Sequence, residues 1–153
     1  MGSMFEVGST RLTDLVHIGI AVRDADETAE FLSSIWDIRG REKDETYEPK
    51  EDELQGGQPF SVRLVWLTRG TLTIELLEPL DEQSIWWRFI AEKGEGIHHI
   101  AFGVSDYDAM VSTFRSQGRP PLLAAGRAGE RWCYVEAPGG ALIELREEVA
   151  TKG

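Results

Sequence analysis

Two histidines and two glutamates have the types and the spacing to bind a metal ion. His17 and His99 each begin an apolar segment, and Glu75 and Glu144 each stand between an isoleucine and a leucine. Taken singly, each could be an ordinary core histidine or a strand-end acid that faces water. A polar side chain inside an apolar strand is costly unless it is paired, hydrogen-bonded or metal-bound. Because two imidazoles and two carboxylates together suit one divalent ion, we predict a single metal centre.

The four residues fall at corresponding places in an internal repeat. His99 follows His17 by 82 positions (99 − 17), and Asp106 follows Asp24 by the same interval (106 − 24). Each half runs from a histidine segment through an amphipathic segment to a segment that contains Ile-Glu-Leu. A repeat of this kind indicates two units of the same fold. A pseudo-two-fold relation between the units would bring both histidines and both glutamates together.

Hydrophobic periodicity and turn residues predict the elements that must hold these side chains. Apolar runs predict strands at about 15–22, 39–47, 61–68, 72–77, 98–104, 122–124, 131–136 and 141–146. Helices are predicted at 24–36, 82–93 and 106–117, the second of which ends at Gly94 and Gly96. The predicted fold class is α+β, with a βαβββ unit that occurs twice.

These elements divide the chain into an N-terminal tail and one domain. Residues 1–14 form the tail, and the domain at 15–149 contains module one at 15–80, a linker helix at 82–95 and module two at 98–147. The polar stretch at 42–58, rich in Glu, Lys, Gly and Gln, is an insertion in module one. Its composition predicts a loop or flap.

Strand alternation assigns the residues of each histidine segment to two faces. His17, Gly19 and Ala21 share one face, and the large apolar residues between them share the other. Only small residues accompany the histidine, which predicts open space and hence a cavity on that face. His98 points away from His99 if the strand is regular, and we interpret it as structural.

Three further residues receive structural interpretations. Trp86 and Trp87 lie in the linker helix, where packing in the core or at an interface is the expected role. Cys133 is interpreted as a small apolar strand residue, neither a nucleophile nor a ligand. A single cysteine excludes an intrachain disulfide, which suits a reducing cytoplasm.

Composition and charge exclude several classes of function. A chain of 153 residues with 41% hydrophobic and 28% charged residues is typical of one globular domain. No stretch approaches the ~20 apolar residues of a membrane span, and the first residues lack the pattern of a secretory signal. The net charge of −11 repels nucleic acid phosphates and anionic lipid. We therefore expect a cytoplasmic protein that binds neither nucleic acid nor membrane.

Three segments carry a resemblance to a known family: HIGIAV at 17–22, IELLEPL at 74–80 and KGEGIHHIAF at 93–102. They resemble the vicinal oxygen chelate superfamily, which includes glyoxalase I, extradiol dioxygenases and the bleomycin and fosfomycin resistance proteins, and are most similar to methylmalonyl-CoA epimerase. The resemblance covers residues 15–147. It implies a glyoxalase-like fold, in which two tandem βαβββ modules form a cupped mixed sheet, and a homodimer. It also implies metal ligands at His17, Glu75, His99 and Glu144.

Departures from the family patterns leave several activities open. The epimerases usually have Gln as the second ligand, where this chain has Glu75, and an ungapped alignment places Leu64 where they have a catalytic Glu. Bacterial glyoxalase I uses the same His, Glu, His, Glu set, but its glutathione-binding Arg and Asn would fall at Ala21 and Pro79. Extradiol dioxygenases usually have a second His at the position of Glu75. Antibiotic-binding members commonly lack the metal residues.

The chemistry shared by the epimerase and glyoxalase I is abstraction of a proton from a carbon next to a metal-bound carbonyl. We therefore predict a metal-dependent isomerase or epimerase in which Glu75 and Glu144 are catalytic. Its only cofactor is one divalent ion: nickel, cobalt, zinc, manganese or iron. A glyoxalase I-like lyase, a non-catalytic small-molecule binder and an extradiol-type dioxygenase are the alternatives. The substrate is a small molecule, for example an acyl-CoA thioester, whose phosphates could bind Arg115, Arg119, Arg127 and Arg131.

Overall fold

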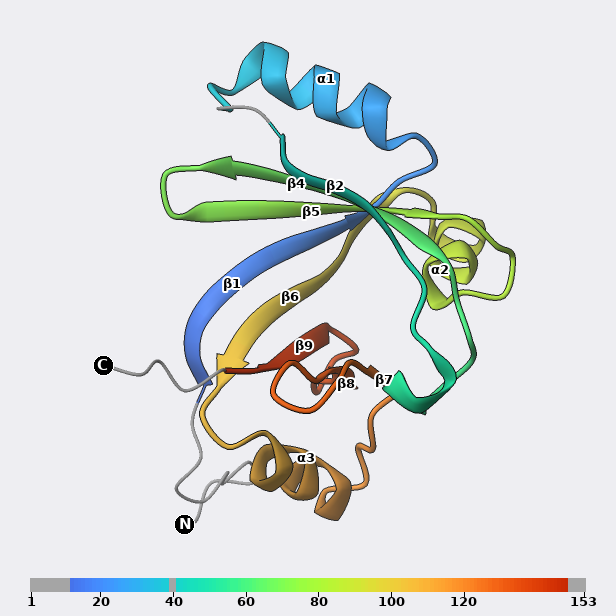
Figure 1. Cartoon of the computed structure of the whole chain (residues 1–153), viewed down its shortest axis with the longest axis vertical. Helices are drawn as coiled ribbons and strands as arrows, with labels where there is room; N and C mark the ends of the chain where they lie inside the picture. Colours follow the sequence, from blue (N-terminus) through green and yellow to red (C-terminus); the bar gives the residue numbers. More distant parts are fainter. Residues whose placement is uncertain (1–11, 39–40, 149–153) are drawn as a thin grey trace.

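The computed structural model describes residues 12–38 and 41–148. Over these residues the chain forms one curved nine-stranded sheet with three α-helices (Figure 1). The elements, in chain order, are β1 (Leu12–Ala21), α1 (Ala25–Ile35), β2 (Arg41–Tyr47), the 3-10 turn η1 (Glu51–Glu53), β3 (Leu54–Gly56), β4 (Val62–Arg69), β5 (Leu72–Pro79), α2 (Ile85–Lys93), β6 (Gly96–Val104), α3 (Tyr107–Ser116), β7 (Leu123–Ala125), β8 (Trp132–Glu136) and β9 (Leu142–Glu147).

The sheet has the order β2-β4-β5-β1-β6-β9-β8-β7-β3, which contains the repeat twice. In module one, β1 pairs in parallel with β5, and β5 pairs antiparallel with β4. In module two, β6 pairs in parallel with β9, and β9 pairs antiparallel with β8. The modules join where β1 and β6 run antiparallel. This arrangement confirms the predicted α+β fold and its cupped mixed sheet.

Each βαβββ unit buries the apolar side of its sheet beneath its own helix. Val22 and Leu76 pack with Ala25 and Ala29 of α1, and module two has an equivalent cluster beneath α3. Burial of these side chains removes apolar area from water and is the main force that holds each helix on its strands. The concave side of the sheet is thereby left for the functional residues.

The helices begin at capping residues. Asp24 accepts a hydrogen bond from the backbone N–H of Glu27 at 3.0 Å, and Asp106 accepts one from Ala109 at 3.1 Å. The linker helix starts at Ile85, three residues later than predicted, because Asp81 holds the preceding residues in a turn. One carboxylate oxygen of Asp81 accepts from the backbone N–H groups of residues 83 and 84.

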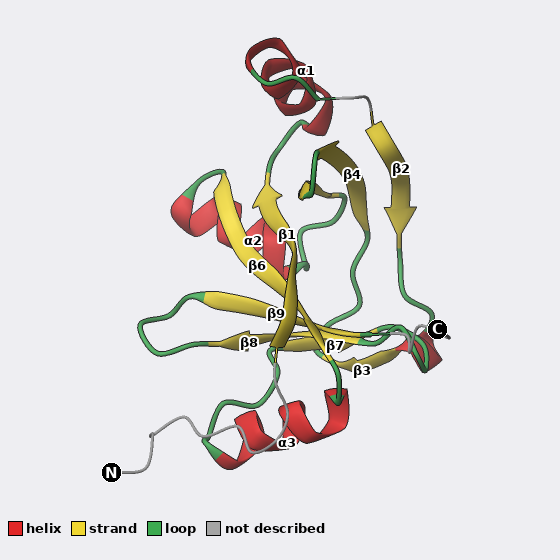
Figure 2. Ribbon diagram, turned by 90° about the vertical axis from the view of Figure 1, so that its left-hand side faces the viewer, coloured by secondary structure: helices red, strands yellow, loops and turns green. Residues whose placement is uncertain are grey.

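Two predicted boundaries were wrong. The first strand begins at Leu12, so the last three residues of the predicted tail at 1–14 belong to β1, and residues 1–11 lie outside the described part of the chain. The predicted loop at 42–58 contains most of β2 together with η1 and β3. β3 is a strand because its backbone pairs with β7 of module two, supported by a hydrogen bond from Gln55 Nε2 to the carbonyl of Gly126 at 2.7 Å. Figure 2 shows β2 and β3 on the same flank of the molecule.

None of the helices in the described residues is long and apolar enough to cross a membrane. α1, the longest, has 11 residues, about half the length that a membrane span requires.

Candidate metal centre

The four predicted ligands converge on the concave side of the sheet. His17 comes from β1, Glu75 from β5, His99 from β6 and Glu144 from β9, and all four are buried. Nε2 of His17 lies 3.1 Å from Nε2 of His99, and each of these nitrogens lies 3.4 Å from Oε1 of Glu75. Glu144 approaches the same nitrogens at 3.4 and 3.7 Å. One ligand atom from each residue lies within 4.8 Å of all the others.

The register of the four central strands explains this convergence. Gly19 is paired with His99 across β1 and β6, and on its other side with Glu75 of β5. Ala101 is paired in the same way with His17 and with Glu144 of β9. The small residues were predicted to leave open space, but the imidazole of His99 occupies the space at Gly19. A Cβ atom there would lie 2.1 Å from Cε1 of His99.

Trp66 and Tyr134 support the two imidazoles. Trp66 is the antiparallel partner of Glu75, and its ring contacts that of His17 edge-on at 5.0 Å. Tyr134 is the partner of Glu144, and its ring lies 4.7 Å from that of His99. Neither aromatic residue was predicted from the sequence to lie at the site. β4 and β8 occupy the same place in the two modules. Comparing the sequences of these two strands could therefore have identified Trp66 and Tyr134.

The charges of the cluster are mutually dependent. Burial alone would raise the pKa of Glu75, but the charge of His17 and the contacts with both imidazoles hold it well below its ordinary value. Burial lowers the pKa of His17, but Glu144 and Glu75 outweigh it and raise the pKa above 6.5. Burial, together with the charges of Glu144 and Glu75, raises the pKa of Tyr134 well above its ordinary value, which keeps the phenol neutral. The negative charge of the two glutamates therefore attracts a cation. When no metal ion is bound, a proton on His17 takes the place of that cation.

Unsatisfied polar atoms indicate that this cluster fits a metal ion. Oε1 of Glu75 is buried and makes no hydrogen bond within the described residues, although two imidazole nitrogens lie 3.4 Å away. A buried acceptor without a partner is costly. An ion that bound both carboxylates and both Nε2 atoms would satisfy these groups, and the mixed nitrogen and oxygen donors suit a divalent transition metal.

His98 does not lie where a regular strand would place it. The pairing of β6 with β1 shifts between Gly19 and Ile20, so that residues 97 and 99 have consecutive partners and His98 is an extra residue in the strand. A β-bulge of this kind breaks the alternation of side chains. His98 is therefore buried beside His99, with 2.9 Å between their Nδ1 atoms. Burial, with the nearby charge of His99, lowers the pKa of His98 to about 3.

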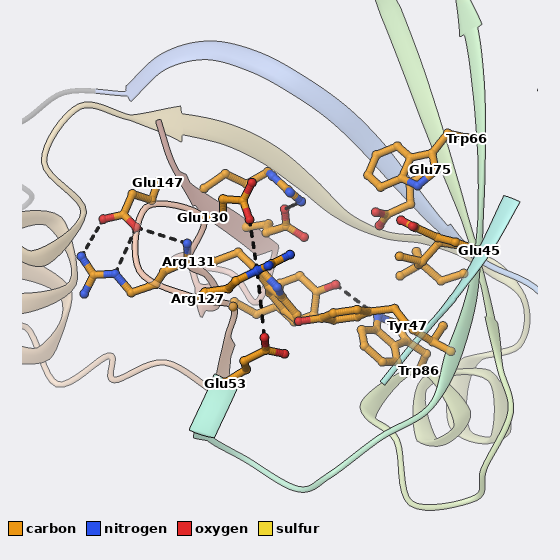
Figure 3. Close-up of a pocket in the computed structure, with 18 residues that line it drawn as sticks. Glu45, Tyr47, Glu53, Trp66, Glu75, Trp86, Arg127, Glu130, Arg131 and Glu147 are labelled. Carbon is orange, nitrogen blue, oxygen red and sulfur yellow. Dashed lines mark hydrogen bonds and ion pairs between the residues drawn. The ribbon is translucent and has the colours of Figure 1, made fainter. Parts of the chain in front are cut away.

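Two members of the candidate cluster, Glu75 and Glu144, line a cavity of about 510 Å³. Figure 3 shows Glu45, Trp66 and Glu75 gathered at one end of it, and Glu53, Arg127 and Glu130 joined by ion pairs at another. The remaining lining residues are Tyr47, Val62, Leu64, Leu77, Trp86, Gly126, Arg131, Trp132, Tyr134, Glu144, Arg146 and Glu147. The wall thus combines aromatic faces with charged groups, as expected of a small-molecule site.

Arg146 and Glu45 are among the charged cavity residues that were not identified from the sequence. Nη1 of Arg146 donates to Oε2 of Glu144 at 3.0 Å. Arg146 follows Glu144 by two residues and therefore lies on the same face of β9. Strand alternation could have identified it. Glu45 of β2 faces the same cavity and is the strand partner of Leu64. Residue 45 falls in the strand predicted at 39–47, but its pairing with Leu64 depends on the register between β2 and β4, which no local pattern gives.

Only two of the four arginines suggested for phosphate binding line this cavity. Arg131 is held by Asp108 and Glu147 at 2.8 and 2.6 Å, and Arg127 lies 3.4 Å from Glu130. Arg119 donates to the carbonyl of Glu136, and Arg115 lines a separate cavity of about 330 Å³ beside α3. The lining guanidinium groups thus already have carboxylate partners.

The residues given structural interpretations are placed as follows. Cys133 is fully buried as a free thiol, and burial raises its pKa to about 11. Trp86 is buried in the core and also lines the cavity, whereas Trp87 is 42% exposed. The thiol is therefore inert at neutral pH, and the two tryptophans have different roles.

Comparisons with known proteins agree with the fold. The sequence profile of the Glyoxalase/Bleomycin resistance protein/Dioxygenase superfamily matches residues 16–135. The uncharacterized protein YqjC of Bacillus subtilis (strain 168) is 31% identical over 138 residues, which cover 87% of this chain and 91% of that protein. A 2-epi-5-epi-valiolone epimerase of Actinomyces sp is 28% identical over 151 residues, covering 84% of this chain and 76% of the relative.

A solved structure of methylmalonyl-CoA epimerase, in complex with methylmalonyl-CoA and NH4+, is also similar. It superimposes with a TM-score of 0.70 at 33% identity, covering 92% of this chain and 97% of the epimerase. The chain therefore belongs to the Glyoxalase/Bleomycin resistance protein/Dioxygenase superfamily, and it has epimerases among its relatives.

Proposed function

We propose that this protein is a metal-dependent epimerase or isomerase that removes a proton from a carbon next to a carbonyl group. The observation that carries the proposal is the buried cluster of His17, Glu75, His99 and Glu144, whose two glutamates line the cavity. These residues would hold one divalent ion, which when bound polarises the substrate carbonyl and stabilises the developing enolate. The two epimerase relatives support this class of reaction.

Carboxylates on different sides of the cavity would move the proton. Glu75 and Glu144 come from different modules and face the metal position from opposite sides of the pseudo-two-fold axis. Arg146 holds one oxygen of Glu144, which leaves the other oriented toward the imidazoles. We include Glu45 as a further base, because it reaches the cavity beside Leu64, the position aligned with the epimerases' catalytic Glu.

Exchange of the substrate proton with deuterium from solvent tests these roles. Glu75→Gln, Glu144→Gln and Glu45→Gln should each slow exchange by about 10²- to 10⁴-fold, the usual effect of losing a general base. Glu45 is not in the metal cluster, so its variant should retain the metal content of the wild type. Glu130→Gln, at the cavity edge, is the matched control and should exchange normally. Unchanged exchange in both Glu75→Gln and Glu144→Gln would contradict the proposed mechanism.

The substrate class follows from a panel of carbonyl compounds. An acyl-CoA thioester is our first candidate, since the structural neighbour was solved with methylmalonyl-CoA. A ketone is the second candidate, because the Actinomyces relative is named as an epimerase of 2-epi-5-epi-valiolone. Deuterium uptake by one class identifies the substrate. Conversion of a hemithioacetal would instead indicate a glyoxalase-type lyase, and oxygen uptake with a catechol would indicate a dioxygenase.

Metal analysis separates an enzyme from a non-catalytic binder. We expect close to one equivalent of bound ion after incubation with nickel, cobalt, zinc, manganese or iron(II) and removal of the excess. Wild-type protein that retains none of these ions would favour the binder, because the four ligands would then have no metal to hold.

We also propose a homodimer that covers the outer face of the central strands. Leu15 and Val16 of β1 and Ile97 and Ile100 of β6 are 37–63% exposed, and α1 and α3 cover other parts of the sheet (Figure 1). Contiguous exposed apolar residues are typical of association surfaces. Sedimentation should give twice the chain mass, and Ile100→Lys should shift it toward the monomer. A monomeric wild type would contradict the proposal.

A further inference from the structure

We propose that His98 is a positioning residue for the metal ligand His99. It accepts a hydrogen bond from Nδ1–H of His99, and this bond fixes both the ring orientation and the tautomer that presents Nε2 to the metal. The inference rests on the metal centre of the proposed function. It assigns a role to a residue outside the ligand cluster.

The two nitrogens of His99 have different surroundings. Nε2 faces His17, Glu75 and Glu144 at 3.1 to 3.4 Å, whereas Nδ1 faces the imidazole of His98 at 2.9 Å. A neutral imidazole carries one proton, and a metal ligand needs its lone pair free. The proton of the liganded His99 is therefore on Nδ1. At 2.9 Å it points at Nδ1 of His98, which must be the acceptor.

The rings around His98 keep that acceptor in place. Phe89 and Tyr134 contact the His98 ring at 5.0 and 5.2 Å, and Trp86 lies at 6.3 Å. The Nε2 atom of His98 is buried and has no hydrogen-bond partner among the described residues. Within the described part of the chain, the hydrogen bond to His99 is thus the one that the His98 ring makes. The linker helix supplies Trp86 and Phe89, so its packing against β6 positions this contact.

Module one has no equivalent of this arrangement. Val16 is the repeat counterpart of His98 (98 − 82) and is 37% exposed, and Nδ1 of His17 makes no hydrogen bond within the described residues. The bulge itself is repeated, because Leu15 and His17 have the consecutive partners Phe102 and Ala101. The departure from the repeat is therefore the histidine at position 98, which serves one ligand. Partners of this kind orient metal-bound histidines, and their loss typically weakens metal binding by about 10- to 100-fold.

The hydrogen bond can be observed in the zinc-loaded wild-type chain. In ¹⁵N NMR spectra we expect His99 to be protonated at Nδ1 and to show a through-hydrogen-bond coupling to Nδ1 of His98. A His99 ring protonated at Nε2, or the absence of that coupling, would overturn the proposal. This measurement needs no variant, so it decides the question even where a substitution prevents folding.

Two substitutions then separate the hydrogen bond from packing. His98→Leu fills the site without an acceptor and should weaken cobalt and zinc binding by about 10- to 100-fold. His98→Asn places an amide oxygen near the position of Nδ1 and should bind metal within a few-fold of the wild type. Val16→Ala, at the counterpart position, is the control and should bind normally. Thermal unfolding of the metal-free variants confirms that each is folded.

The outcomes distinguish this inference from the proposed function. Equal metal binding by the wild type and His98→Leu overturns the role of His98 and leaves the metal centre intact. Metal binding by His98→Asn that is as weak as that of His98→Leu has the same meaning. A wild type that binds no metal contradicts the metal centre and, with it, this inference.

Discussion

His17 connects the charge of the cluster to the pH at which a metal can bind. The protonated imidazole must lose its proton before Nε2 can act as a ligand, and the carboxylates of Glu144 and Glu75 raise its pKa above 6.5. The proton therefore competes with the ion over a pH range that extends above the ordinary histidine pKa. The carboxyl of Glu75 does not compete there, because its pKa is held well below the ordinary range.

Metal affinity should consequently rise with pH. Below the pKa of His17, we expect affinity to fall by up to about tenfold for each pH unit, since one proton must be displaced. Calorimetric titration with cobalt at several pH values measures this, and buffers with different ionisation enthalpies count the protons released. An affinity that stayed constant between pH 6 and 8 would show that His17 is already neutral.

Gly19 is required by the ring of His99. Gly19→Ala places a methyl group 2.1 Å from Cε1 and 2.5 Å from Nε2 of that ring, so the ring must move. We expect a loss of about 1–3 kcal/mol in the free energy of unfolding and at least a tenfold loss of metal affinity. Ala101→Gly, at the repeat counterpart, is the control and should retain metal binding. Normal cobalt binding by Gly19→Ala would mean that the ring has an alternative position.

At the level of elements, the repeat conserves the way its helices begin. Asp24 and Asp106 occupy equivalent positions, and each accepts a hydrogen bond from a backbone N–H in the first helical turn. Such a bond satisfies a donor that has no partner inside the helix.

Removal of one cap should therefore destabilise its helix. Asp106→Ala should reduce the free energy of unfolding by about 1 kcal/mol, and Asp106→Asn, which keeps the acceptor, by much less. Urea denaturation of the metal-free chain measures both. Equal stabilities of the two variants would show that the cap is unimportant for α3.

The strand β3 is the element with the largest consequence for the cavity. Its chain segment leaves β2 at one end of the sheet and pairs with β7 at the other, which places Glu53 on the cavity wall beside Arg127. Module one thereby contributes a segment to the sheet of module two. Periodicity within the polar stretch gave no sign of this pairing, because an edge strand of three residues has almost no alternation to detect.

For the whole molecule, the candidate metal centre lies at the junction of the two modules. Each module supplies one histidine and one glutamate, so a bound ion links β1 and β5 to β6 and β9. An ion that binds the folded chain but not the unfolded chain stabilises the fold by mass action.

A bound ion should accordingly raise the unfolding temperature. At a free concentration about 100-fold above Kd, the expected stabilisation is about 2.7 kcal/mol. Calorimetry with and without cobalt or zinc measures it, and a chelator should reverse it. Glu144→Gln should show a smaller increase, because one ligand is weakened. An unfolding temperature insensitive to every ion tested would contradict the metal centre.

The sequence by itself determined the repeat, the fold class and the four residues of the cluster. The constant interval between His17 and His99 and the paired Ile-Glu-Leu segments are local patterns, and symmetry turns them into a spatial prediction. Only the tertiary structure decided the position of His98, the pairing of β3 and the aromatic neighbours of the cluster. These depend on register between strands distant in sequence, and a one-residue bulge changes the face of a side chain without any local signal.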